Sequence, residues 1–137
     1  MRKLIVNTSM IFIFSMVIFF SCKDSGTNFN IDDVEIPSKN VSYSEHIQPI
    51  FNYKCTNSGC HDGSTRAGNL DLTNYAATVS RSDIVFPGSA ELSKLIWAVE
   101  GTGGTEIMPP FTAGVTPITD NQLMGMKTWI NEGAEAN

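Results

Sequence analysis

Residues 55–61 read Cys55-Thr56-Asn57-Ser58-Gly59-Cys60-His61. This heptapeptide holds two of the three cysteines and one of the two histidines of the 137-residue chain. The histidine directly follows the second cysteine, and the residues between the cysteines favour a turn, because Asn and Gly tolerate the backbone angles that turns require. The side chains with the most distinctive chemistry are thus concentrated in one short segment.

Helical periodicity extends over three segments around it, 42–54, 88–101 and 119–133. Each begins with residues typical of helix N-termini, and the last two end at a glycine. Pro49 lies within the first pattern, so we expect that helix either to kink or to begin near Gln48. The expected inward faces are Ile47, Ile50, Phe51 and Lys54, then Leu92, Leu95, Ile96 and Val99, and finally Leu123, Met126, Trp129 and Ile130.

Local signals support a mostly α fold. Ser42 with Glu45, and Thr119 with Gln122, have the spacing of capping boxes. A fourth, short helical turn is expected within residues 73–79. No run alternates between apolar and polar residues for long enough to predict a sheet. We therefore expect three to four short helices joined by long loops.

Two of these loops, 56–70 and 101–118, are long and polar. A domain of about 100 residues buries a smaller share of its surface than a larger one, and long loops of this kind usually serve a function. A large apolar group bound in the middle would compensate for the small core.

The heptapeptide resembles the haem-attachment site of c-type cytochromes, where two cysteines join the haem vinyl groups as thioethers and the next histidine binds iron. The common spacing is Cys-x-x-Cys-His, and the four-residue spacing found here occurs as a variant. A turn at 57–59 would keep both sulfur atoms within reach of the haem. The resemblance implies covalent attachment through Cys55 and Cys60, with His61 as the proximal ligand.

The resemblance extends over residues 42–134, which are similar to small bacterial c-type cytochrome domains. It implies a small cytochrome c-like fold wrapped around one covalent haem c, with the closing helix packed across the first. It also implies that Met108 supplies the second axial ligand. The segments that carry it, in chain order, are Gly68–Leu72, Val85–Leu95, Met108–Pro110 and Leu123–Ala134.

Met108 also stands out on its own. Of the three methionines after residue 21, Met124 and Met126 lie on a predicted helix, whereas Met108 lies in a loop rich in Gly and Pro. A thioether there has little to pack against unless a ligand is near, although filling a gap is the alternative role. We expect Met108 to bind the haem iron.

Other polar and aromatic residues have less specific roles. Arg66 and Arg81 are candidates to pair with haem propionates, with plain surface positions as the alternative. Trp97 and Trp129 are expected in the core or on the wall of the cofactor site. His46 is expected to be exposed on the first helix, with iron binding as the alternative.

Two other interpretations of the cysteines stay open. His46, Cys55, Cys60 and His61 could form a tetrahedral zinc site, although the paired Cys-x-x-Cys spacing is missing. A Cys55–Cys60 disulfide would instead leave a non-haem interaction module. If Met108 did not bind iron, a haem sensor or enzyme subunit with an open sixth position would remain.

Residues 1–21 have the pattern of a secretory signal, because Arg2 and Lys3 precede thirteen apolar side chains within residues 4–20. Phe19-Phe20-Ser21-Cys22 resembles the lipobox of bacterial lipoproteins, which implies cleavage before Cys22 and lipidation of its thiol. We expect a tether at 22–41 that carries a cytochrome c-like domain at 42–137. Docking of part of the tether onto the domain is the alternative.

Seven basic and fourteen acidic residues lie after Cys22, which gives this part a net charge of −7. Such a charge argues against nucleic-acid binding, which depends on a basic surface. It favours redox partners with basic docking patches. The resemblances to c-type cytochromes and to lipoproteins imply an electron carrier rather than an enzyme, lipid-anchored in the cell envelope on the periplasmic or cell-surface side.

Overall fold

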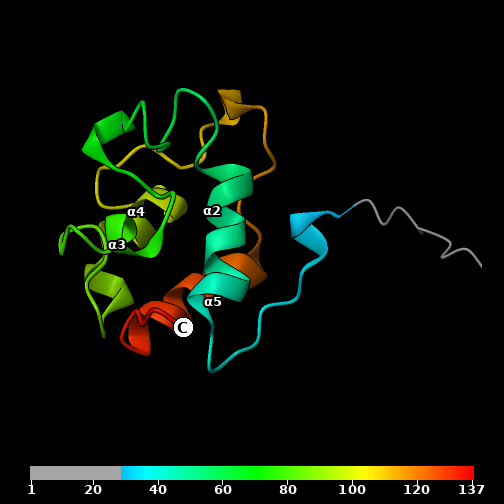
Figure 1. Ribbon diagram of the computed structural model, residues 1–137, viewed down its shortest axis with the longest axis vertical. Helices are drawn as coiled ribbons and strands as arrows, with labels where there is room; N and C mark the ends of the chain where they lie inside the picture. The colour runs from blue at the N-terminus through cyan, green and yellow to red at the C-terminus, as the bar shows by residue number, and fades with distance from the viewer. Residues whose placement is uncertain (1–28) are drawn as a thin grey trace, which may run out of the picture.

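The computed structural model describes residues 29–137, and all the regular structure in this range is helical (Figure 1). No strand occurs among these residues, so the predicted mostly α class with three to four short helices is confirmed. The α-helices are α2 (Gln48–Lys54), α3 (Tyr75–Thr78), α4 (Lys94–Glu100) and α5 (Asp120–Asn131). The shorter turns are η2 (Ile31–Asp33), η3 (Tyr43–Ile47), η4 (Ala67–Asn69), η5 (Ala90–Leu92) and η6 (Phe111–Ala113).

The first predicted helix is divided into two parts. η3 is a turn of π-helix, and α2 begins at Gln48 with Pro49 in its first turn, where the missing N–H has no partner to lose. The Ser42 hydroxyl accepts a hydrogen bond from the Glu45 amide at 3.2 Å, as the capping box predicts. The Ser42 amide, however, donates to Nδ1 of His46 at 2.9 Å. His46 is therefore part of the helix cap.

The other two predicted helices are present with one change. A separate turn, η5, precedes α4, and Leu92 at its end is 56 % exposed, so the prediction that Leu92 faces inward is wrong. Gly101 ends α4 with φ of 65°, a conformation that glycine adopts at no steric cost. Thr119 and Gln122 form both bonds of the predicted capping box, and α5 follows directly.

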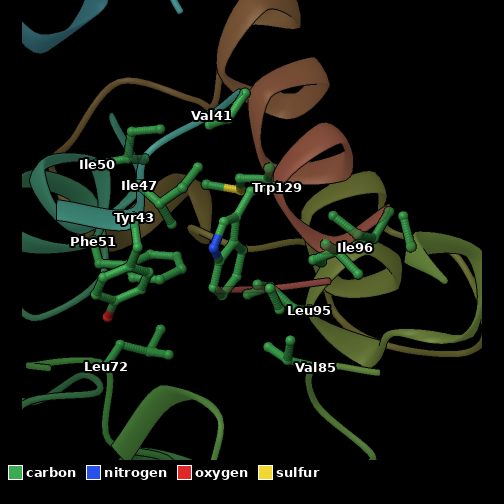
Figure 2. Packing of buried hydrophobic residues seen from close by; sticks show 14 of the residues in the cluster. Val41, Tyr43, Ile47, Ile50, Phe51, Leu72, Val85, Leu95, Ile96 and Trp129 are labelled. Atoms are coloured by element: carbon green, nitrogen blue, oxygen red, sulfur yellow. The ribbon is translucent and has the colours of Figure 1, made fainter. Parts of the chain in front are cut away.

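The hydrophobic core centres on Trp129 of α5 (Figure 2). Its ring lies 5.2 Å from that of Tyr43, which in turn lies 5.2 Å from Tyr75 and 6.4 Å from Phe51. α5 contacts η3, η5 and α4, so the closing helix meets the start of the first helical segment as expected. The fully buried side chains around Trp129 include Ile47, Ile50, Leu72, Ile96, Met126 and Ile130.

Residues 29–41, called here the N-terminal strap, lie against the domain on the side of α2 away from α4 (Figure 1). Ile31, Ile36 and Val41 are 6 %, 5 % and 0 % exposed. Of the two readings of residues 22–41, docking therefore holds for residues 31–41 and the free tether does not, because apolar side chains at intervals of about five residues pack on the core.

The predicted signal at residues 1–21 and the lipidated Cys22 lie outside the residues that the structure describes. Within residues 29–137, no helix has the length and apolar character needed to cross a membrane.

Candidate haem site

One cavity brings together three of the four predicted haem-binding side chains, those of Cys55, His61 and Met108. It encloses about 880 Å³ of space, including its opening to solvent. Its walls come from α2, α4 and α5, from the two long loops and from positions between 72 and 84. Most of the other lining residues are apolar, namely Phe51, Leu70, Leu72, Ile84, Leu95, Ala98, Val99, Ile118 and Met126.

The heptapeptide folds back on itself at the end of α2. The Cys60 amide donates to the Asn57 carbonyl at 2.9 Å, and Gly59 between them has φ of 89°. This is a β-turn with a positive φ at its third position, which glycine favours. The His61 amide donates to the Cys55 carbonyl at 3.0 Å and closes the loop. The predicted turn within the four-residue spacing is thus confirmed.

Cys55 and Cys60 are both free thiols. Cys55 lines the cavity, whereas Cys60 is half-buried and does not line it. Burial raises the pKa of the Cys55 thiol to about 12, so it is protonated at neutral pH. The structure therefore does not contain the Cys55–Cys60 disulfide on which the non-haem alternative depends.

The zinc alternative fails on geometry. It needs four ligands on one ion, and within residues 29–137 no three side chains of His, Cys, Asp or Glu are grouped as a metal site would require. His46 caps the first helical segment instead, with its Nδ1 bonded to the Ser42 amide. It does not line the cavity, so its alternative role as an iron ligand is not supported either.

The His61 ring is held in one tautomer. Its Nδ1 lies 2.9 Å from the carbonyl oxygen of Ala67. Because a carbonyl can only accept, Nδ1 carries the proton and Nε2 keeps its lone pair free. Metal-binding histidines are oriented in this way, with the second nitrogen donating to a carbonyl. Ala67 lines the same cavity, and its amide donates to the Cys60 carbonyl at 2.9 Å.

Met108 reaches the cavity because its loop is fastened to α4. The Met108 amide donates to the Ala98 carbonyl at 2.8 Å, and Ala98 is itself a cavity residue. Gly103 packs against the ring of Trp97, where an added Cβ would lie 3.0 Å from the nearest ring atom. The glycine-rich stretch before Met108 is therefore a packed connection.

The cavity lining includes two basic side chains. Arg81 and Lys94 both line it, and both bind the Asp83 carboxylate, with their nearest nitrogens 2.9 Å from Oδ2. These hydrogen bonds, from Arg81 first and then Lys94, hold the pKa of Asp83 at about 2. Arg66 does not line the cavity and pairs with Asp71 at 3.5 Å.

The two tryptophans that were candidates for the core or the cofactor wall lie away from the cavity lining. Neither Trp97 nor Trp129 lines the cavity; Trp129 is 1 % exposed and belongs to the core. Sequence reasoning missed Lys94, Asp83 and Ala67. The pairing of Lys94 with Asp83 depends on the turn between them, and the role of Ala67 belongs to its backbone, which no residue type reveals.

Comparison with known proteins agrees with this site. A family model described as Planctomycete cytochrome C matches residues 58–111, a range that includes Cys60, His61 and Met108 and leaves out Cys55. No curated protein and no solved structure matches the chain. Residues 58–111 thus match a planctomycete cytochrome C domain, which implies electron transfer by covalently bound haem.

Proposed function

We propose that this protein is a lipid-anchored, single-haem c-type cytochrome that transfers electrons in the cell envelope, on the periplasmic or cell-surface side. The observation that carries the proposal is the shared cavity, which is lined by Cys55 and His61 of the heptapeptide and by Met108 of the distant 101–118 loop. The family match over residues 58–111 supports the same class of protein.

The residues present fit a haem. The cavity is mostly apolar, as a porphyrin requires, and its lining includes Arg81 and Lys94, two cationic side chains that share Asp83 and are the candidates to pair with the propionates. Cys55 and Cys60 would hold the group through thioethers, and His61 and Met108 would be the axial ligands. When bound, haem supplies one-electron chemistry, and a His/Met ligand pair raises its reduction potential.

The chain itself supplies orientation and exclusion of water. The Ala67 carbonyl holds the His61 ring with Nε2 free, and the bond from Met108 to Ala98 places the thioether loop beside α4. With both axial positions filled, no position is left for a substrate or for oxygen. The site then only exchanges electrons, which is why we propose a carrier and not an enzyme.

Charge sets the kind of partner. The part of the chain after Cys22 has a net charge of −7. An acidic surface attracts redox proteins that carry basic docking patches and speeds their encounter. The expected complexes are small and short-lived.

The membrane anchor is proposed from the sequence. Ser21-Cys22 follows the apolar run as in lipoproteins, and two or three acyl chains hold a protein on a membrane far more firmly than one. Changing Cys22→Ala should release the protein from membranes or leave its signal uncut. Fractionation as the mature, membrane-bound form would contradict lipidation.

Binding of carbon monoxide to the reduced protein tests the axial ligands. We expect no binding to the unchanged protein and rapid binding to Met108→Ala, because loss of the thioether opens one axial position. Met124→Ala is the matched control, since Met124 is 58 % exposed on α5 and lies outside the cavity. Equal binding in all three proteins would contradict ligation by Met108 and favour a sensor or an enzyme subunit.

A further inference from the structure

The N-terminal strap is bound to the domain along its whole length. Gln122 donates from Nε2 to the Ile31 carbonyl at 3.0 Å. The side-chain amide of Asn121 both accepts from the Ile36 amide at 2.8 Å and donates to the Ile36 carbonyl at 3.1 Å. The strap is therefore attached to α5 by bonds between side chains of the helix and the main chain of the strap.

Apolar packing strengthens this attachment. Ile36 lies on Gly125 of α5, where an added Cβ would come within 2.5 Å of Ile36 Cγ2. At the far end of the strap, the Glu132 carboxylate accepts from the amides of Asn40 and Val41 at 2.7 and 2.9 Å. The strap thus follows α5 to the end of the domain opposite the heptapeptide.

The beginning of the strap lies at the end of α2 that leads into the heptapeptide. The Phe29 ring packs at a tilt against that of Tyr53 with centroids 5.3 Å apart, and the Asp32 carboxylate binds Lys54 at 2.5 Å. Tyr53 and Lys54 end α2 and directly precede Cys55. Asp32 also accepts from Thr116 at 2.6 Å, and Lys54 donates to the Pro117 carbonyl at 2.6 Å.

This placement decides which end of the domain a lipid anchor would hold. From Cys22 to Phe29 the chain has seven steps, which span at most about 25 Å. If residues 22–41 were free, twenty steps would join Cys22 to Ser42, which lies at the opposite end of the domain. The anchor could then lie up to about 70 Å from Ser42. The docked strap removes that freedom.

We propose that the N-terminal strap fastens the membrane anchor to the cofactor end of the domain and so keeps the haem cavity close to the membrane surface. The proposal rests on the proposed haem and on lipidation of Cys22. It assigns the strap a positioning role. On a free tether the same anchor would leave the cavity in any orientation and at any height above the membrane within the reach of the tether.

Energy transfer from a fluorescent lipid headgroup to the haem measures the height of the haem above the membrane surface. Full-length, lipidated, haem-loaded protein is placed in vesicles of phosphatidylethanolamine and phosphatidylglycerol that contain a trace of lipid with a fluorescent headgroup. The haem quenches nearby fluorophores, and quenching falls steeply with distance. A Gly-Ser insert of about 20 residues between Asn28 and Phe29 raises the average reach of the linker from about 15 Å to about 29 Å and should roughly halve the quenching.

The matched control places the same insert between Ser38 and Lys39, which are exposed in a bend of the strap. Because residues 31–36 would still hold the anchor at the cofactor end, quenching should stay unchanged. On a free tether the two inserts lengthen the same linker equally. Equal loss in both variants, or loss in neither, would overturn the proposal.

A third variant undocks the strap. Ile36→Asp places a charge against α5, so the insert at Ser38 should now lower quenching as much as the insert at Asn28 does. The haem spectrum of each variant checks that the domain is folded. A colourless protein would count against the proposed cytochrome, and a protein that fails to bind vesicles would count against its lipid anchor. Equal quenching in the two insert variants would count only against the positioning role of the strap.

Discussion

The Ala67 carbonyl oxygen lies 2.9 Å from Nδ1 of His61, and the loop that carries it has an unusual backbone. Arg66, Gly68 and Asn69 have φ values of 47°, 63° and 56°. Residues other than glycine pay an energetic penalty in this left-handed region. The orientation of the His61 ring therefore depends on a strained loop that the surrounding structure holds in place.

Gly68→Ala should destabilise this loop, although no protein atom lies within 4 Å of an added Cβ at Gly68. With respect to the protein, the cost comes from φ of 63° and should lower the free energy of unfolding by about 1 kcal/mol. Denaturant unfolding of the haem-loaded protein measures it. Gly63→Ala is the control, since a Cβ there makes only an ordinary contact of 3.8 Å with Asp71. Equal losses would show that the backbone conformation is not the cause.

Met108→His should lower the reduction potential. An imidazole in place of the thioether removes the His/Met ligand pair that raises the potential. Redox titration of the visible spectrum measures the change. Met124→His should leave the potential unchanged, because Met124 is exposed on α5 and does not line the cavity. A potential that moves in both variants, or in neither, would argue against Met108 as a ligand.

Arg81→Ala should also lower the reduction potential, and by more than Arg66→Ala. Arg81 lines the cavity, and its removal leaves Asp83 with one cationic partner fewer, so the ferric form becomes easier to reach. Arg66 lies outside the cavity and pairs with Asp71. Measuring the reduction potential of both variants in low and in high salt separates the effect of a charge close to the haem from that of a distant surface charge, which salt screens. A larger shift for Arg66→Ala would contradict the assignment.

Docking of the strap should depend on pH through Asp32. Hydrogen bonds from Lys54 and then Thr116 hold the pKa of Asp32 below its ordinary value of 3.8. A carboxyl with a lowered pKa stabilises the docked state above that ordinary value, and this contribution is lost as the pH falls below it. We expect the Ile36 amide, which is bonded to Asn121, to lose protection from hydrogen exchange below about pH 4.

In Asp32→Asn, protection of the Ile36 amide should be weaker at neutral pH and should change little between pH 5 and pH 3. The exchange rates are corrected for the intrinsic effect of pH. A variant that kept the full acid-dependent loss of protection would show that another group controls the strap.

The sequence predicted those parts of the fold that depend on local chemistry. The capping box of Thr119 with Gln122, the glycine that ends α4 and the turn before Cys60 are all decided by neighbouring residues, and the structure confirms them. Leu92 shows where local reasoning fails. Its spacing fits the face of α4, but η5 ends before that helix begins, so the side chain points to solvent.

The parts that the sequence did not predict depend on contacts between distant segments. Residues 29–41 have the composition of a tether, yet Gly125 leaves a space on α5 that Ile36 fills. The bonds from Asn121 and Glu132 that hold the strap lie about 90 residues away in the chain. Likewise, the convergence of Met108 and His61 on one cavity followed from a resemblance, and only the structure places them there.

The visible spectrum of the oxidised and then the reduced protein, followed by acid–acetone extraction, tests the central proposal most directly. The protein is produced together with a c-type maturation system, beside a Cys-x-x-Cys-His cytochrome that matures normally. We predict a sharp reduced haem spectrum that stays with the unchanged protein after extraction and is lost when Cys55 and Cys60 are both replaced by Ser. A colourless protein, or a haem that extracts freely, would contradict the account.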